Sequence, residues 1–322
     1  MTQIFSVVTR RCVFHVSDRL LSQKTTGSAR PFDTNSNKVV VFRANDAQVV
    51  GSYTGRAYLD SIPSDMFIAQ SLLGSPLSGS AFESVGRAAS WTDIGRSVER
   101  LRADLSSAFL RLPKQDRTPN FEVSILGWRQ RIGRNRRITP VIWELKRSPG
   151  AYETEFRIVR HQRWWRWDWG FTLTSIPTLR DEGLVSSMLG RIRESGNESP
   201  EVIKRVLLDA LHRCTLASPE FVGRSCLMVT LTPTASPQAR LRYVVDTGRP
   251  DDLAPDGHGY SPWVIDPPMV FAPAIMRSTT GTGGWTASGS SFSWVIEGLQ
   301  PVVGPRRVSQ SAQKRPPDPQ RR

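Results

Sequence analysis

Two short apolar runs at the start of the chain predict a β-hairpin. Ile4–Val8 and Val13–Val16 are rich in β-branched and aromatic side chains and flank a segment with two adjacent arginines, as strands joined by a polar turn would. The runs Lys38–Phe42 and Gln48–Tyr53 predict a second pair of strands. Between the two pairs, Gln23–Asn37 is polar and contains Gly, Ser and Pro, so we expect a loop there.

Apolar side chains recur at steps of three or four residues in four later segments, and this spacing predicts helices with one buried face. In the clearest case, Ile94–Phe109, arginines and glutamates occupy the other faces. Ser199 followed by Pro200 is typical of a helix start, and Ser64-Asp65 could cap an earlier one. The four predicted helices are Met66–Leu73, Ile94–Phe109, Leu179–Ile192 and Pro200–Cys214.

Alternating apolar and polar positions predict the remaining strands. The order is four strands, two helices, a group of strands, two helices and two strands, which is not the regular alternation of a parallel sheet. Antiparallel pairs interrupted by paired helices favour an α+β fold with two stacked sheets covered by helical layers. The later strands are expected in pairs, at Phe121–Trp128 with Ile138–Leu145, Glu155–Val159 with Trp165–Leu173, and Ser225–Thr232 with Ala239–Val245.

The net charge of +14 over 322 residues is concentrated in two segments. Arg129–Arg166 has eleven Lys or Arg against three acids, and Arg306–Arg322 has six against one. The remainder is nearly neutral, as in a globular domain with basic appendages. Beyond Asp246 the chain becomes rich in Gly, Pro, Ser and Asp, although 263–265 and 292–296 could add edge strands. We therefore expect a main domain at 1–246, an extension at 247–300 and a basic, disordered tail at 301–322.

No window of about twenty residues is continuously apolar, so the sequence predicts neither a membrane-spanning helix nor a signal peptide. The three cysteines, Cys12, Cys214 and Cys226, form no even framework, and we expect reduced thiols in a cytoplasmic protein. The spacing of cysteines and histidines is not that of a metal site. We expect no metal, no cofactor and no membrane contact.

Thr2 is the candidate nucleophile, because it directly follows the initiator methionine. Without Met1, Thr2 would carry a free α-amine beside its own hydroxyl, so one residue would supply both nucleophile and general base. A nearby lysine would lower the pKa of the hydroxyl, and an aspartate would hold that lysine charged and oriented. Lys38 and Asp18 are the candidates for these roles. The alternatives are a solvent lysine that begins an edge strand and a turn aspartate paired with Arg19 in solvent.

These residues resemble the proteasome β-subunit family of N-terminal nucleophile hydrolases, which includes the bacterial two-component ATP-dependent protease. The resemblance rests on Thr2 at the start, on Ser17-Asp18-Arg19, on Asn37-Lys38 and on Ser52–Ala57. The step of sixteen residues from Thr2 to Asp18 matches the threonine-to-aspartate step of the family. The resemblance implies a four-layer αββα sandwich, cleavage of peptide bonds and a homo-oligomer, and it leaves open whether an ATPase partner exists. It also implies that Gly55 lies on the strand bordering the substrate cleft, where its backbone amide would hold the oxyanion.

A second class of function is a catalytically inactive scaffold or a protein that binds nucleic acid or an acidic partner. In His161–Trp169, arginines are interleaved with tryptophans, which could stack on unpaired bases while the charges follow a phosphate backbone. The other interpretation is a strand whose Trp165, Trp167 and Trp169 face a sheet interface or a neighbouring subunit. Their alternation favours the strand. We therefore expect only weak nucleic-acid contact, mainly through the basic tail.

We predict that Met1 is removed and that Thr2 is the mature N-terminus, because the proposed chemistry requires a free threonine amine. Intact-mass measurement of protein purified from its own host tests this. A mass without the initiator methionine is the expected result. Retention of Met1 in every molecule would contradict the hydrolase hypothesis.

Overall fold

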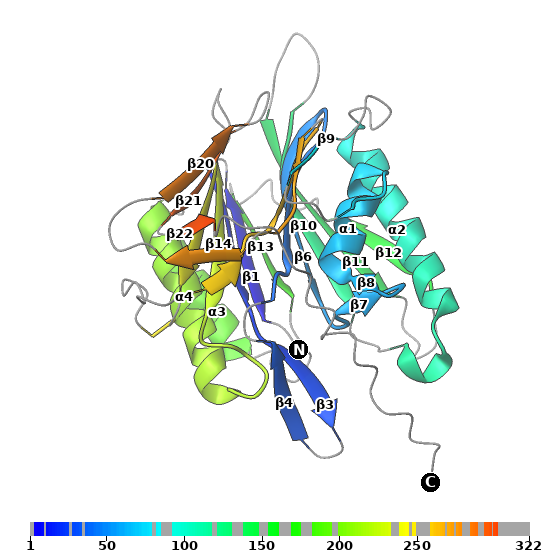
Figure 1. Cartoon of the computed structure of the whole chain (residues 1–322). Coiled ribbons are helices and arrows are strands. Elements are labelled where there is room, and N and C mark those ends of the chain that lie inside the picture. The colour runs from blue at the N-terminus through cyan, green and yellow to red at the C-terminus, as the bar shows by residue number, and fades with distance from the viewer. Residues whose placement is uncertain are drawn as a thin grey trace.

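The computed structural model contains two large β-sheets with helices on their outer faces (Figure 1). The first sheet contains the N-terminal hairpin, and the second contains the strand pair that follows Lys38. The structure describes residues 3–9, 11–25, 28–33, 36–78, 82–84, 92–117, 121–130, 138–147, 154–160, 169–174, 182–194, 199–232, 238–244, 247–248, 258–267, 269–273, 275–278, 284–288, 293–297 and 299–301.

The seven-stranded sheet is antiparallel except where β15 and β21 run parallel. Within it, β1 and β2 form the predicted N-terminal hairpin, with Ser6 opposite His15. In spatial order its strands are β13 (Trp169–Thr174), β1 (Ile4–Thr9), β2 (Val13–Asp18), β14 (Cys226–Thr232), β15 (Gln238–Val244), β21 (Ser293–Glu297) and β20 (Gly284–Ser288).

The eight-stranded sheet is also antiparallel except at one pair, β5 with β17. Its strands β5 and β6 are the predicted second pair, with Val39 opposite Ser52. In spatial order the strands are β12 (Phe156–Arg160), β11 (Ile138–Arg147), β10 (Glu122–Gln130), β6 (Ala47–Thr54), β5 (Val39–Arg43), β17 (Trp263–Asp266), β18 (Met269–Phe271) and β9 (Phe82–Ser84).

Four α-helices and three small sheets complete the described part of the chain. The helices are α1 (Ser64–Leu73), α2 (Ile94–Arg111), α3 (Glu182–Glu194) and α4 (Pro200–Ala217), and a short 3-10 turn, η1 (Lys114–Asp116), follows α2. The small sheets pair β3 (Leu21–Thr25) with β4 (Ser28–Asp33), β7 (Tyr58–Leu59) with β8 (Ile62–Pro63), and β19 (Ile275–Ser278) with both β16 (His258–Tyr260) and β22 (Leu299–Pro301).

Three clusters of buried apolar side chains hold the sheets and helices together. The first joins α1 and α2 to the outer face of the eight-stranded sheet and includes the contacting rings of Phe109, Phe121 and Phe156. The second fills the space between the two sheets, and the third joins α3 and α4 to the outer face of the seven-stranded sheet. Figure 1 shows the resulting order of helices, sheet, sheet and helices. The fold is therefore of the α+β class that the order of elements predicts.

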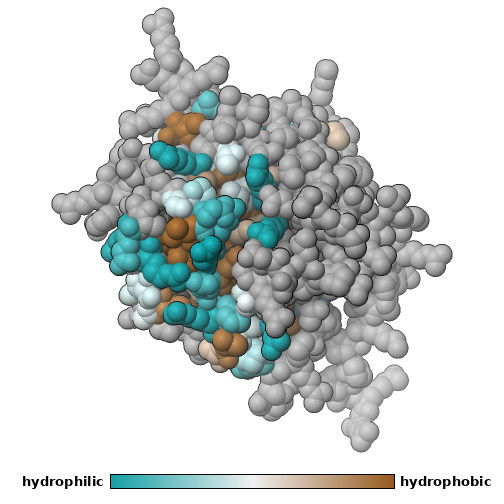
Figure 2. Space-filling view, turned by 90° about the vertical axis from the view of Figure 1, so that its left-hand side faces the viewer, coloured by the Kyte–Doolittle hydropathy of each residue, from teal (hydrophilic) through white to brown (hydrophobic). Residues whose placement is uncertain are grey.

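Side chains of β5 alternate between two of these clusters. Val39 and Val41 face the other sheet, whereas Val40 and Phe42 face α1 and α2, because successive side chains of a strand point to opposite faces. Figure 2 views the side on which α3 and α4 lie, where the described hydrophilic side chains surround smaller apolar patches. Leu216 of α4 is the most exposed large apolar residue among those described.

Two expectations about local structure are wrong. Gln23–Asn37 is not simply a loop, because β3 and β4 form a hairpin that projects from one end of the sheets (Figure 1). The strands expected near Glu155–Val159 and Trp165–Leu173 do not pair with each other, since β12 lies beside β11 and β13 lies beside β1 in the other sheet. Alternation identifies a strand and its buried face but not its partner.

The expected helix starts differ in detail from those observed. α1 begins at Ser64 with Pro63 at the N-cap position, so Ser64 and Asp65 lie in its first turn rather than before it. Ser199 is the N-cap residue of α4 and Pro200 follows in its first turn, both as expected, but the Ser199 side chain makes no capping hydrogen bond. The start of α2 is held by a residue distant in sequence, since Asp46 accepts hydrogen bonds from Ile94 N (2.8 Å) and Arg129 Nε (2.6 Å). A carboxylate at this end of a helix is favoured by the helix dipole.

Strands from beyond Asp246 belong to both large sheets. Trp263 of β17 lies opposite Val40, and Trp294 of β21 lies opposite Ala239. Both expected strands are thus present, but neither lies at an edge, because β18 and β20 continue the sheets beyond them. The division of the chain at residues 246 and 300 stays a prediction. The tryptophan segment at 161–168 and the tail at 302–322 lie outside the described residues.

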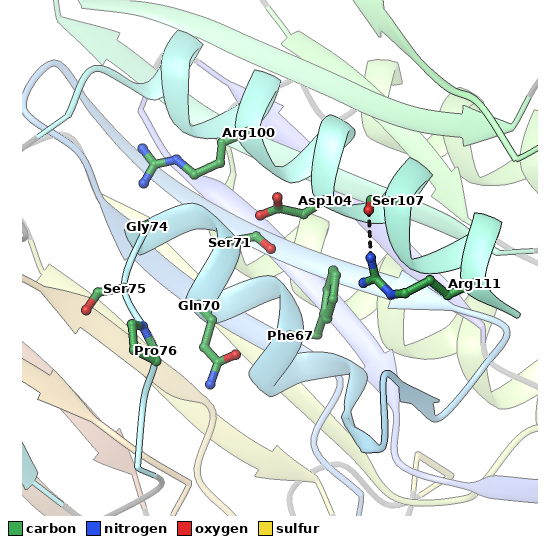
Figure 3. A pocket seen from close by; sticks show the side chains of 10 residues that line it. All are labelled: Phe67, Gln70, Ser71, Gly74, Ser75, Pro76, Arg100, Asp104, Ser107 and Arg111. Atoms are coloured by element: carbon green, nitrogen blue, oxygen red, sulfur yellow. Dashed lines mark hydrogen bonds between the residues drawn. The ribbon is translucent and has the colours of Figure 1, made fainter.

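A groove of about 400 Å³ runs between α1 and α2 (Figure 3). Two arginines line it, and both have partners: Arg111 pairs with Asp60 and donates to Ser107, while Arg100 donates to Thr92 Oγ1 at 3.5 Å and lies against Gly74. Gly74 ends α1 in a left-handed conformation with φ 77°. The carbonyl end of a helix carries partial negative charge, so α1 itself balances Arg100. We therefore assign these cations to packing of the two helices.

We predict that Gly74→Ala lowers the free energy of unfolding by about 1–2 kcal/mol, because a left-handed backbone costs a residue with a β-carbon about that amount. The added carbon would also lie 1.2 Å from Arg100 Nη1, so the arginine has to move. Urea unfolding measures the change. Gly95→Ala in α2 is the matched control, since nothing lies within 4 Å of its added carbon and alanine favours a helix. Equal losses in the two variants would contradict the assignment.

Candidate active site

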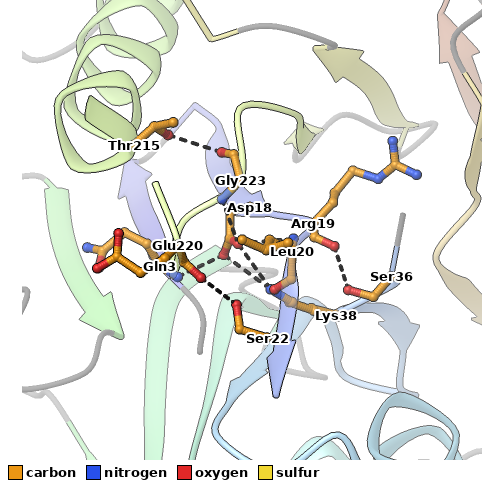
Figure 4. A network of polar contacts seen from close by, with 10 residues as sticks. All are labelled: Gln3, Asp18, Arg19, Leu20, Ser22, Ser36, Lys38, Thr215, Glu220 and Gly223. Atoms are coloured by element: carbon orange, nitrogen blue, oxygen red, sulfur yellow. Dashed lines mark hydrogen bonds and ion pairs between the residues drawn. The ribbon is translucent and has the colours of Figure 1, made fainter. Parts of the chain in front are cut away.

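Asp18 and Lys38 meet at one end of the two sheets (Figure 4). Asp18 is the last residue of β2, and Lys38 immediately precedes β5, so each large sheet supplies one partner. Lys38 Nζ lies 3.2 Å from both Oδ1 and Oδ2 of Asp18. Both side chains are 0% exposed. The solvent-exposed alternatives for these residues are therefore wrong, and β5 is not an edge strand because it lies between β6 and β17.

Backbone N–H groups from three segments bind the Asp18 carboxylate. Gln3 N donates to Oδ1 at 2.8 Å, and Leu20 N and Gly223 N donate to Oδ2 at 3.1 and 3.4 Å. Asp18 N in turn donates to the carbonyl oxygen of Gln3 at 3.2 Å. The carboxylate is thus fixed to the first described residue of the chain, to its own turn and to the segment after α4.

Among the described residues, Lys38 has one further partner, the carbonyl oxygen of Leu20, at 2.6 Å from Nζ. Burial lowers the pKa of Lys38, and the charge and hydrogen bonds of Asp18 oppose that shift. The negative charge of Asp33 also favours the ammonium form, whereas Arg19 disfavours it. A lysine with these partners is a positioned cation whose charge depends on one buried carboxylate.

The segment that leads into Lys38 is fixed by its own side chains. Ser36 donates to the carbonyl oxygen of Arg19 through both N (3.1 Å) and Oγ (2.7 Å). Asn37 bonds both backbone groups of Val39, with Oδ1 accepting from N and Nδ2 donating to O, each at 3.1 Å. Asn37 Nδ2 also donates to Asp65 Oδ2 at 2.8 Å. Residues on either side of Lys38 are therefore held independently of its ammonium group.

Gly55 follows directly after β6 and has φ 106°, a conformation that favours glycine. Continuing the register of Val39 opposite Ser52 puts Lys38 opposite Tyr53. Gly55 then lies two residues further along, or about 7 Å. It is at the same end of the sheet as Lys38, while Thr2 lies outside the described residues. The structure thus brings Asp18 and Lys38 into contact and places Gly55 nearby.

Several contacts of the site could not be identified from the sequence. Leu20 and Gly223 contribute backbone groups, which carry no signal of residue type. Asp65 looked like a helix cap, but its carboxylate accepts hydrogen bonds from Asn37 and from Trp263 Nε1 at 3.1 Å. In the sequence, only the motif Asn37-Lys38 indicates this region, and the motif assigns no role to the side-chain amide of Asn37.

A buried histidine lies on β2, three residues before Asp18. Ser6 Oγ and His15 Nδ1 are 2.8 Å apart, and His15 Nε2 has no hydrogen-bond partner among the described residues. Burial lowers the pKa of His15 from 6.5 to about 3. The imidazole is therefore neutral at pH 7, and we assign it to packing between the two sheets, on the face of β2 that Val13 also occupies.

Other chemistries have little support in the described residues. Cys12, Cys214 and Cys226 are buried and form no disulfide. No three His, Cys, Asp or Glu side chains of the described part are grouped so that they could hold a metal ion. None of the described helices combines the length and the apolar character needed to cross a bilayer.

No protein-family model matches the sequence, and no curated protein matches it either. Among solved structures, the chain is similar to Anbu, the ancestral beta-subunit from Yersinia bercovieri. The similarity has a TM-score of 0.40 and 11% sequence identity, and covers 70% of this chain and 80% of that chain. Values this low do not assign a function, which has to be inferred from the residues of this chain.

We predict that stability falls when the pH is lowered from about 6.5 towards 3. In the unfolded chain His15 protonates near its ordinary pKa of 6.5, whereas the folded chain keeps it neutral down to about 3. The folded state is thus favoured fully above pH 6.5 and loses up to about 1.4 kcal/mol for each pH unit below it. Urea unfolding of wild type and His15→Asn across this range measures the effect. Parallel pH profiles in the two proteins would contradict it.

Proposed function

We propose that this protein is an N-terminal threonine hydrolase that cleaves amide bonds, with Thr2 as the nucleophile after removal of Met1. One observation carries the proposal: the fully buried Lys38–Asp18 pair, bound through Gln3 N to the residue next to Thr2. Consecutive Cα atoms are about 3.8 Å apart. Gln3 N contacts the Asp18 carboxylate, and Thr2 is the preceding residue. The amine and hydroxyl of Thr2 would therefore lie one residue along the chain from a group that binds the partner of Lys38.

The free energy of burial supports a functional role for this pair. Removing each charge from water costs several kcal/mol, and a buried ion pair often stabilises a fold no better than apolar side chains of similar volume. Stability alone therefore does not explain a lysine that is 0% exposed. Burial that lowers the pKa of Lys38, together with one specific carboxylate partner, is typical of functional sites.

Lys38 and Asp18 would act on the nucleophile through charge. An ammonium has three N–H donors, and the two equal distances to Asp18 fit one shared N–H, with a second N–H on Leu20 O. The third would then be free to donate to the Thr2 hydroxyl. A cation there stabilises the developing alkoxide, and Asp18 keeps the lysine charged.

In the reaction, the Thr2 oxygen attacks the carbonyl carbon of the substrate, and its proton passes to the Thr2 amine. The C–N bond then breaks, and the amine returns this proton to the leaving nitrogen. The acyl group remains on the Thr2 oxygen as an ester. Attack by water, with the same amine as base, releases the acid and restores Thr2. The Gly55 backbone amide would stabilise the oxyanion in both steps.

The substrate class that fits this chemistry is a peptide, and the assembly we propose is a homo-oligomer of proteasome-like subunits. The four-layer sandwich of the N-terminal nucleophile hydrolases is the fold we propose. Its support is the order of helices, sheet, sheet and helices, with the Lys38–Asp18 pair at one end of the sheets.

We predict that a β-lactone, which acylates reactive hydroxyl groups, labels Thr2 in wild type and fails to label it in Lys38→Met. Peptide mapping by mass spectrometry locates the label. Lys38→Met should also lose about 3–5 kcal/mol of stability, because Asp18 remains buried without its cation. Undiminished labelling of folded Lys38→Met would remove Lys38 from the mechanism.

Two controls separate lost chemistry from lost stability. The double variant Asp18→Asn/Lys38→Met removes both charges of the buried pair, so it should regain stability relative to Lys38→Met yet stay unlabelled. Arg102→Met removes the cation of an exposed pair with Glu99, which should cost no more than about 1 kcal/mol. Labelling of Arg102→Met should match wild type, and its loss there would show that the assay reports general stability.

A further inference from the structure

The Asp65 carboxylate joins three segments that are far apart in the sequence. Its Oδ2 accepts a hydrogen bond from Asn37, which precedes Lys38, and one from the indole N–H of Trp263 in β17. Asp65 itself lies in the first turn of α1. One buried oxygen thus connects the entry to Lys38, a helix start and a strand from the C-terminal part of the chain.

Asp65 is held by hydrogen bonds from N–H groups. No described cation forms an ion pair with it, and burial raises the pKa of its carboxyl group. The opposing effects are hydrogen bonds from Asn37, from the backbone at Met66, from Trp263 and from its own backbone. Helix N-termini favour negative charge. The Asp65 carboxylate is therefore stabilised by N–H donors. Loss of one donor would leave the carboxylate less firmly positioned and so weaken its hydrogen bonds with the remaining donors.

β17 is placed so that it can bring its donor to Asp65. Trp263 pairs in parallel with Val40, two residues after Lys38. Its indole is buried in the apolar cluster beneath α1 and α2. Backbone pairing therefore places β17 beside β5, the strand that follows Lys38, while the Trp263 side chain reaches the start of α1.

We propose that Asp65 is a positioning residue for Lys38 and that strand β17 completes the active centre by donating Trp263 Nε1 to it. The proposal rests on the role of Lys38 in the proposed function. Asn37 is the link, because it binds Asp65 and both backbone groups of Val39. Hydrolysis would then require β17, although this strand supplies no group to the reaction.

Trp263→Phe tests the proposal, because it keeps an aromatic ring and removes the N–H donor. Hydrogen exchange at the Val39 amide, which donates to Asn37 Oδ1, reports how firmly Asn37 is held. We expect exchange at Val39 to be about tenfold faster, as when a hydrogen bond to a charged group is lost, and labelling of Thr2 by the β-lactone to be slower.

Trp143→Phe is the matched control. Trp143 is buried in the same apolar cluster, but its indole donates to none of the described residues, so exchange at Val39 should stay within about twofold of wild type. Asp65→Ala removes the shared acceptor without changing an aromatic ring, and it decides the question if Trp263→Phe does not fold. Equal exchange at Val39 in wild type and in either folded variant would overturn the proposal.

The two readouts separate this inference from the proposed function. Faster exchange at Val39 with no labelling of Thr2 even in wild type would support the link through Asp65 and contradict the hydrolase. Labelling that is equal in wild type and Trp263→Phe, despite faster exchange, would overturn the claim that β17 completes the active centre.

Discussion

A buried lysine and a buried aspartate, one from each large sheet, constrain how the two sheets can be placed. Separation of the pair would leave an uncompensated charge in the interior, at a cost of about 3–5 kcal/mol. The two sheets must therefore meet so that the end of β2 reaches the start of β5. At the far end of β1, Trp128 Nε1 donates to Thr9 O at 3.0 Å and joins the sheets a second time. Polar contacts thus fix both ends of β1 relative to the eight-stranded sheet.

Between these contacts, the side chains that fill the space between the sheets change from apolar to polar along the strands. Around Trp128 it is filled by valine, leucine and isoleucine side chains. Towards Lys38 the buried positions include Ser6, His15 and Ser52. Apolar packing supplies the free energy that holds the sheets together. Polar side chains near the ion pair cost part of that stability, as is common where a fold supports a functional site.

The sequence was informative where a signal is local and uninformative where a partner is distant. Periodicity identified α2 and the strands β10 and β11, because one buried face repeats in the chain itself. The contact between Asp18 and Lys38 was predicted because a known motif joins them, while their role in a site stays a prediction. The partners of β12 and β13, and the position of β17 inside a sheet, depend on pairing between residues far apart, which no single segment encodes. The backbone amide of Gly223 on Asp18 could not be predicted from any residue type.

The buried carboxylates of Asp18 and Asp65, both near the start of β5, are stabilised in different ways. This difference supports different roles for the two residues. Asp18 is neutralised by an ammonium group and accepts three backbone N–H groups. Within the described part of the chain, Asp65 is held by N–H donors without a cation, and two of these donors are the side chains of Asn37 and Trp263. A carboxylate paired with a lysine controls the charge of that lysine. A carboxylate without a cation controls only position, so its effect on chemistry has to pass through the backbone that Asn37 holds. The active centre we infer therefore includes the N-terminal hairpin, the entry to β5, the start of α1 and a strand from the last quarter of the chain.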